Sequence, residues 1–214
     1  MTAHSRAALA RRIVQAGYNA MGDAYLTTRD QDGPDVALLR DLAARLPGGA
    51  RVLDAGCGPG APVLRFLSAR YRTVGVDFSE TQLALARRSA PGAWLVCQDM
   101  TTLAFPDATF DAVVSYFAII HIPREAHPAL LRNFHRMLKP GGYALLSAGR
   151  TAWVGTEPDF CGVRMWWSHY DGATFVAFMR ASGFEIVWTR MEADSLGDDA
   201  AGEHLFILAR SAGG

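Results

Sequence analysis

The sequence is poor in cysteine, contains a single lysine, and has no excess of either charge. Its 214 residues include Cys57, Cys97 and Cys161, an odd number of cysteines at wide spacing. This pattern fits neither a disulfide framework nor a zinc site, so we expect no metal and a reducing, cytoplasmic location. The 21 basic and 21 acidic residues give a formal net charge of zero. That balance disfavours an enzyme that grips nucleic acid through a broad basic face.

The chain also lacks long apolar runs. No stretch approaches the roughly 20 consecutive apolar residues of a membrane-spanning helix, so no membrane partner is expected. The N-terminal segment carries Arg6, Arg11 and Arg12, but it lacks the apolar core of a secretory signal and is interpreted as an amphipathic helix. Half of the residues are apolar and a fifth are charged, which excludes a disordered chain and favours one large core.

Helical and strand-like patterns alternate along most of the chain. Up to about residue 50, apolar residues recur at helical spacing. Short apolar runs then predict buried strands at 52–55, 73–76, 94–97, 110–115 and 143–147. Helices are predicted between them at 62–70, after the capping pair Ser79 and Gln82, and at 124–138. Continuous apolar strands that alternate with helices are typical of parallel strands covered on both faces, so we predict a doubly wound α/β sheet.

The alternation stops after the fifth strand. Residues 149–172 show no clear periodicity and are predicted to be an irregular insertion. A helix at 173–182 and two strands at 184–190 and 204–209 follow. The connection at 194–202 is long enough only for a hairpin, so the last strand is predicted to be antiparallel to its predecessor.

A glycine-rich loop, Asp54-Ala55-Gly56-Cys57-Gly58-Pro59-Gly60, follows the first strand and precedes the first helix of the sheet. Glycines there permit a tight turn and let a ligand approach the backbone. In such sheets ligands bind beyond the carboxyl ends of the strands. A dinucleotide site prefers G-x-G-x-x-G, whereas here the spacing is G-x-G-x-G and the next residue is Ala61.

Acidic residues end three successive strands. Asp54 would repel a pyrophosphate but suits a ligand with an ammonium or sulfonium group. Asp77 stands where a carboxylate accepts hydrogen bonds from both ribose hydroxyls. Asp99 with Met100 can hold the amino edge and the face of an adenine. S-adenosylmethionine is one molecule that combines these parts. The alternative is that the loop is only a tight turn and the acids are helix caps.

These segments resemble class I S-adenosylmethionine-dependent methyltransferases, in the branch that includes quinone-biosynthesis and small-metabolite enzymes. The similarity covers about residues 50–210, with Ala104 where the family more often has proline. It implies S-adenosylmethionine as cofactor, and a Rossmann-like seven-stranded sheet with the last strand antiparallel and helices on both faces. The matching segments are Val52-Leu53-Asp54-Ala55-Gly56-Cys57-Gly58-Pro59-Gly60, Val74-Gly75-Val76-Asp77-Phe78-Ser79, Gln98-Asp99-Met100 and Leu138-Lys139-Pro140-Gly141-Gly142.

The resemblance also implies cofactor contacts from aromatic residues. A tyrosine of the N-terminal helices often closes over the methionine end of the cofactor, and the candidates are Tyr18 and Tyr25. Their alternative role is to pack the first helix on the sheet. Phe78 lies in the second matching segment. Tyr116, just after the fourth strand, stands where the methyl group is presented and can touch both cofactor and substrate.

Two histidines are candidates for a general base. Methyl transfer needs alignment and exclusion of water above all, and a base helps only when the nucleophile carries a proton. His121 lies shortly after the fourth strand, and His169 lies in the irregular segment. Either could accept a proton near neutral pH. The alternative is that both are hydrogen-bonded structural residues.

The aromatic segment 149–172 is the predicted substrate wall. It contains Trp166, Trp167 and Tyr170, together with Arg164, whose guanidinium could hold a carboxylate or phosphate. The alternative is a hydrophobic cover over the sheet edge. Methyltransferases that act on base nitrogens usually have an Asn/Asp-Pro-Pro-Tyr segment after the fourth strand. Here it reads Ser115-Tyr116-Phe117-Ala118, so nucleic acid is disfavoured as a substrate.

The sequence therefore predicts a single domain, 1–214, that methylates nitrogen, oxygen or carbon of a small molecule with S-adenosylmethionine. Residues 1–50 would cover the cofactor and substrate site, and 51–214 would form the sheet with its insertion. Two rivals stay open: an NAD-dependent oxidoreductase on a similar sheet, and a non-catalytic protein that binds S-adenosylmethionine. The oligomeric state, monomer or homodimer, is left undetermined.

Overall fold

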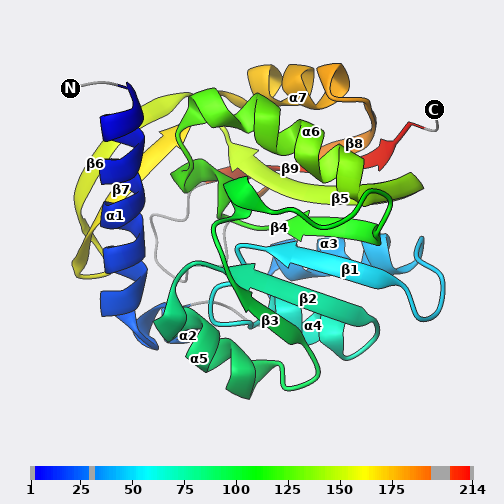
Figure 1. Ribbon diagram of the computed structural model, residues 1–214, viewed down its shortest axis with the longest axis horizontal. Helices are drawn as coiled ribbons and strands as arrows, with labels where there is room; N and C mark the ends of the chain where they lie inside the picture. The colour runs from blue at the N-terminus through cyan, green and yellow to red at the C-terminus, as the bar shows by residue number, and fades with distance from the viewer. Residues whose placement is uncertain (1–2, 29–31, 194–202, 213–214) are drawn as a thin grey trace.

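One twisted sheet of seven strands runs through the domain. The computed structural model describes residues 3–28, 32–193 and 203–212, and the connection at 194–202 lies outside them. The strand order is β3-β2-β1-β4-β5-β9-β8 (Figure 1). These strands are β1 (Arg51–Ala55), β2 (Arg72–Asp77), β3 (Trp94–Cys97), β4 (Phe110–Ser115), β5 (Leu138–Gly149), β8 (Phe184–Ala193) and β9 (Glu203–Ser211).

The predicted strand directions are confirmed. Strands β1 to β5 pair in parallel with their neighbours. Strand β9 pairs antiparallel with both β5 and β8, so the last strand is the reversed one. The carboxyl ends of the five parallel strands therefore meet at one edge of the sheet.

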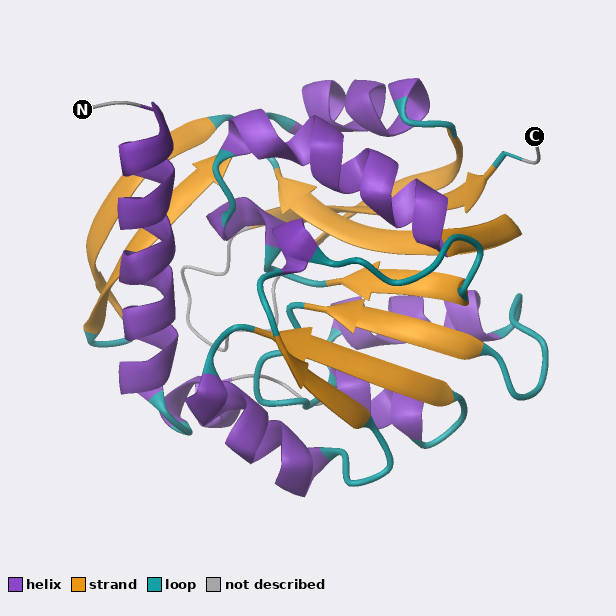
Figure 2. Ribbon diagram, in the orientation of Figure 1, coloured by secondary structure: helices purple, strands orange, loops and turns teal. Residues whose placement is uncertain are grey.

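Helices cover both faces of this sheet (Figure 2). Successive residues of β1 show why. Val52 belongs to a buried cluster with α3 (Pro34–Ala43) and α4 (Val63–Ser68) on one face, and Leu53 belongs to a cluster with α6 (His127–Met137) and α7 (Gly172–Ala181) on the other. Both side chains are fully buried, as expected of a strand that is apolar throughout. The helices are α1 (Ala3–Met21), α2 (Ala24–Thr28), α3 (Pro34–Ala43), α4 (Val63–Ser68), α5 (Glu80–Ser89), α6 (His127–Met137) and α7 (Gly172–Ala181).

The segment predicted to be irregular is instead a β-hairpin, so that prediction was wrong. Strands β6 (Trp153–Phe160) and β7 (Val163–His169) form a separate two-stranded antiparallel sheet. Cys161 and Gly162 connect them with φ of 52° and 81°, the two positive values of a type I′ turn. The pair Cys-Gly lacks the Asn-Gly or Asp-Gly signature of such a turn, and so the sequence did not reveal it.

Helix α1 and the hairpin stand together beyond the carboxyl ends of the parallel strands (Figure 1). They touch where Gly17 meets β7, since a Cβ at Gly17 would lie 2.9 Å from Cε of Met165. Tyr25, Val14 and Met165 form a small buried cluster at this junction. Among the described residues, no helix is long and apolar enough to cross a membrane.

Candidate functional site

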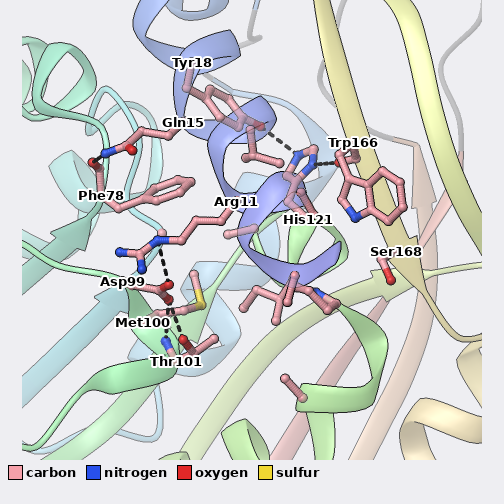
Figure 3. Close-up of a pocket in the computed structure, with 18 of the residues that line it drawn as sticks. Arg11, Gln15, Tyr18, Phe78, Asp99, Met100, Thr101, His121, Trp166 and Ser168 are labelled. Carbon is pink, nitrogen blue, oxygen red and sulfur yellow. Dashed lines mark hydrogen bonds and ion pairs between the residues drawn. The ribbon is translucent and has the colours of Figure 1, made fainter. Parts of the chain in front are cut away.

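A cavity of about 1190 Å³ lies between α1, the hairpin and the carboxyl ends of β1 to β4. Its walls come from four parts of the fold: one face of α1, the glycine loop, the segments after β2, β3 and β4, and β7. Figure 3 shows side chains from α1 and from the strand ends pointing toward one another across it. Cavities for small molecules commonly measure 300–1,000 Å³, so this one has room for a cofactor and a second small ligand.

The glycine loop forms the floor of the cavity. Gly56 has φ of +82°, and a Cβ there would lie 2.2 Å from the Cβ of Ala118 and 2.8 Å from the Cε of Met100. A Cβ at Gly58 would meet nothing within 4 Å, which leaves the backbone open to a ligand. Gly60 does not line the cavity; its φ of +85° and its closeness to the Cα of Ala86 fit a structural role against α5.

Asp77 is the carboxylate at the centre of the floor. Its Oδ2 accepts a hydrogen bond from the Gly58 N–H at 2.9 Å, and its Oδ1 accepts one from the Ser79 N–H at 2.9 Å. Burial raises the pKa of Asp77, while the N–H groups of Ser79, Gly58 and Phe78 lower it. Each oxygen has a second lone pair, so the carboxylate can still accept from the two hydroxyls of a ribose.

Asp54 lies beside rather than inside the main cavity. Its side chain is 1% exposed and lines an adjoining space of about 30 Å³ together with Tyr25, Gly58 and Tyr116. Tyr25 and Tyr116 line both spaces. A cationic group that entered from the main cavity would therefore approach Asp54 past these two rings.

Asp99 and Met100 form the next part of the wall, after β3. Oδ1 of Asp99 accepts from the Thr101 N–H at 2.8 Å and from the Thr101 hydroxyl at 2.7 Å. Its other oxygen, Oδ2, pairs with Nε of Arg11 at 3.1 Å. Phe78 and Met100 are both drawn beside this pair in Figure 3. An oriented carboxylate between two apolar side chains fits the amino edge and the faces of an adenine.

Tyr18 and His121 form a hydrogen-bonded pair in the wall opposite the strand ends. The Tyr18 hydroxyl lies 2.9 Å from Nε2 of His121, and Nδ1 lies 2.7 Å from the carbonyl oxygen of Trp166 (Figure 3). A carbonyl only accepts, so Nδ1 carries the proton and Nε2 accepts from Tyr18. Burial lowers the pKa of His121 to about 4, against a smaller opposing effect of the Trp166 carbonyl. The imidazole is therefore neutral at pH 7.

Not every predicted substrate residue reaches the cavity. Trp166 lines it, as do Tyr116 and His121. The other three predicted substrate residues, Arg164, Trp167 and Tyr170, lie outside the lining, and so does the candidate base His169. Arg164 is exposed, and His169 packs over Gly149. The Trp167 indole donates to Glu157 at 2.9 Å, and the Tyr170 ring packs on Phe178 and His127. The side chains of His169, Trp167 and Tyr170 thus support the hairpin and its attachment to the sheet.

Sequence reasoning missed the polar residues of α1 and β7. Arg11 and Gln15 line the cavity from α1, and Ser168 lines it from β7. Gln15 donates to the Phe78 carbonyl at 2.7 Å, and the Ser168 hydroxyl accepts from the Arg124 N–H at 2.9 Å. One face of α1 carries Ala7, Arg11, Val14 and Tyr18. Helical spacing alone does not distinguish a cavity wall from a core face, and no sequence motif marks this one.

The fold and the cavity define an α/β domain with a large cavity at the carboxyl edge of its parallel strands. Residues 52–142 match the family model described as a methyltransferase domain. Over this segment the chain is therefore similar to methyltransferase domains, and its fold is similar to that of an S-adenosylmethionine-dependent methyltransferase. The part of the chain that the structure describes contains no cluster of three or more histidine, cysteine or acidic residues placed to hold a metal ion.

Curated relatives share this domain but are longer. Phosphoethanolamine N-methyltransferase of Triticum aestivum is 38% identical over 105 residues, which cover 46% of this chain and 20% of the relative. Trans-aconitate 2-methyltransferase of Variovorax paradoxus is 38% identical over 108 residues, which cover 48% of this chain and 40% of the relative. The matched part of the chain thus spans less than half the length of these relatives.

Solved structures support the same fold over most of the chain. An S-adenosylmethionine-dependent methyltransferase from Mesorhizobium loti has a TM-score of 0.64 at 26% identity, covering 85% of this chain and 100% of that chain. The 1,6-didemethyltoxoflavin-N1-methyltransferase of Burkholderia thailandensis, solved with its substrate and S-adenosylhomocysteine, has a TM-score of 0.74 at 23% identity. It covers 99% of this chain and 91% of that one, and establishes likeness of fold.

Proposed function

We propose that the protein transfers a methyl group from S-adenosylmethionine to a small molecule bound between α1, β7 and the strand ends. One observation carries the proposal: a single cavity joins the glycine loop, Asp77 and Asp99 on one side to the Tyr18–His121 pair on the other. The first side suits an adenosine, and the second can handle the proton of an acceptor. Relatives named for phosphoethanolamine and trans-aconitate support a small metabolite as the acceptor.

The cofactor residues in this proposal each hold one part of the ligand. Asp77 would accept from the ribose hydroxyls, and Asp99 with Phe78 and Met100 would hold the adenine. The open backbone at Gly56 and Gly58 would admit the amino-acid portion, near Asp54, Tyr25 and Tyr116. Once bound, S-adenosylmethionine supplies a methyl carbon that is activated by its sulfonium charge. The protein then has to align the acceptor with this carbon and keep water away.

The Tyr18–His121 pair would take the proton that the acceptor loses. The acceptor would give up this proton as it gains the methyl group that S-adenosylmethionine would supply. The acceptor proton passes to the Tyr18 oxygen as the Tyr18 proton moves to Nε2 of His121. The low pKa of His121 makes the imidazolium short-lived, so the proton has to leave for solvent before the next turnover.

The test separates cofactor binding from proton handling. Calorimetry with S-adenosylhomocysteine measures binding, and transfer of a labelled methyl group to phosphoethanolamine, trans-aconitate or 1,6-didemethyltoxoflavin measures turnover. Tyr18→Phe should lower kcat by about 100-fold, the low end of general acid–base catalysis, with little change in S-adenosylhomocysteine affinity. Tyr71→Phe is the matched control, because its hydroxyl donates to the Ala43 carbonyl away from the cavity and should leave kcat unchanged.

Each rival function predicts a different result. An NAD-dependent oxidoreductase would bind NAD and not S-adenosylhomocysteine. A non-catalytic protein would bind S-adenosylhomocysteine without methyl transfer to any acceptor. No binding of S-adenosylhomocysteine by the wild-type chain would remove the basis for methyl transfer altogether.

Two further parts of the proposal concern the setting of the domain. We propose that residues 1–214 act as one domain, supported by the way α1 and the hairpin complete the cavity at the sheet edge. We also propose a reducing, cytoplasmic compartment, supported by the free thiols of Cys57 and Cys97.

A further inference from the structure

The first helix is anchored to the domain mainly through its C-terminal half. Gln15 donates to the Phe78 carbonyl at 2.7 Å, and the Ser79 hydroxyl donates to Oδ1 of Asn19 at 2.6 Å. The Gln82 amide donates to the carbonyls of Tyr18 and Gly22 at 2.8 and 3.0 Å. All of these bonds reach the segment between β2 and the first turn of α5, so this half of α1 is held beside the end of β2.

The N-terminal half of α1 reaches across the cavity through Arg11. Nε of Arg11 lies 3.1 Å from Oδ2 of Asp99, with side-chain exposures of 51% and 16%. Figure 3 shows the Arg11 side chain leaving the helix and passing beside Phe78 toward Asp99. The ion pair therefore joins the helix that covers the cavity to the strand end where the adenine is expected.

The pair also fixes the carboxylate itself. Thr101 holds Oδ1 of Asp99 with two hydrogen bonds, and Arg11 holds Oδ2. Both oxygens are thus oriented before a ligand enters, which lowers the entropy cost of binding. A second lone pair on Oδ2 stays available to an amino group of the ligand. Arg11 can hence pair with Asp99 while the adenosine is bound.

We propose that Arg11 is a positioning residue for the cofactor: its pair with Asp99 closes the N-terminal half of α1 over the adenosine side of the cavity and slows release of the ligand. The inference rests on the proposed function, because it takes the Asp99 side of the cavity as the adenosine site. It assigns a role in cofactor retention to the first helix, at a residue outside the recognised glycine-loop and strand-end segments.

The experiment compares the binding and release of S-adenosylhomocysteine by the wild type and by three variants of Arg11. Calorimetry gives the dissociation constant, and stopped-flow displacement gives the dissociation rate. Arg11→Gln removes the charge and keeps a residue that favours helix. It should raise the dissociation constant and the dissociation rate two- to fivefold, as expected for the loss of a partly exposed ion pair. This equals about 0.4–1 kcal/mol at 1.4 kcal/mol per tenfold change. Arg11→Lys should restore part of the loss. Arg11→Glu places like charges together and should cost more than Arg11→Gln.

The ionic-strength dependence provides an independent readout. Salt screens an exposed ion pair, so the wild-type dissociation rate should rise with salt and that of Arg11→Gln should rise much less. Arg132→Gln, an exposed arginine of α6 outside the cavity lining, is the matched control and should behave like the wild type. Far-ultraviolet circular dichroism confirms that each variant is folded.

Two outcomes would overturn the inference. If Arg11→Gln and Arg132→Gln bind and release S-adenosylhomocysteine alike, the ion pair does not retain the ligand. If Arg11→Gln binds more tightly than the wild type, Arg11 competes with the ligand for Asp99 and opposes binding. Failure of the proposed function gives a separate result, namely that the wild-type protein itself does not bind S-adenosylhomocysteine.

Discussion

Replacement of Gly56 by alanine should destabilise the protein by about 2–5 kcal/mol. A Cβ at this position would lie 2.2 Å from the Cβ of Ala118, which is fixed to its own backbone, and 2.8 Å from the flexible end of Met100. Forced packing of this kind costs about 1–3 kcal/mol. The φ of +82° adds about 1–2 kcal/mol, because an L-residue is disfavoured in the left-handed region.

Urea unfolding of the ligand-free protein measures this loss directly. With about 2–4 °C per kcal/mol for a chain of this size, the Tm should fall by about 4–20 °C. Gly48→Ala is the matched control, because a Cβ there would meet nothing within 4 Å and its φ lies outside the left-handed region. It should change the free energy of unfolding by no more than about 0.5 kcal/mol. Equal losses in the two variants would refute the reasoning.

Two further predictions concern buried groups elsewhere in the fold. Burial lowers the pKa of His121 and of His127 from 6.5 to about 4. Between pH 4 and 6.5 the unfolded chain therefore binds more protons than the folded protein. The free energy of unfolding should rise over this range by roughly 3 kcal/mol per histidine and level off above it. In urea unfolding at a series of pH values, His127→Gln should make this rise shallower. An unchanged pH dependence would contradict the lowered pKa of His127. Ser79→Ala should cost about 1–2 kcal/mol, because Ser79 caps α5 and donates to Asn19; the control Ser89→Ala removes only a bond to Leu85 within the helix and should be nearly neutral.

Much of the fold could be predicted because the strands are short apolar runs bounded by glycine and proline. The parallel strands and the reversed last strand follow from the lengths of the connections between them. The hairpin 153–169 could not be predicted in this way. Its residues face α1 and the cavity on one side and solvent on the other, and aromatic residues on both sides hide the alternation.

The placement of Asp77, Asp99 and the glycine loop beside one cavity was also predictable. Asp77, Asp99 and the glycine loop follow consecutive strands, and the carboxyl ends of neighbouring parallel strands lie close together in any such sheet. Tyr18 and His121 were each candidates, but their pairing was not predictable. They are 103 positions apart and meet because α1 and the turn Ile119–His121 after β4 both pack on β7.

The sequence by itself determined the class of fold, the sheet edge at which the cavity lies and the residues at the strand ends. It could do so because the hydrophobic period and the turn chemistry are local properties of the chain, and short connections limit how consecutive strands can run. Only the tertiary structure decided which residues of α1 and of the hairpin enter the cavity. Arg11 pairs with Asp99, and His121 is buried against Trp166, because elements pack together that no local pattern relates. The ion pair and the low pKa of His121 are therefore properties of the folded molecule.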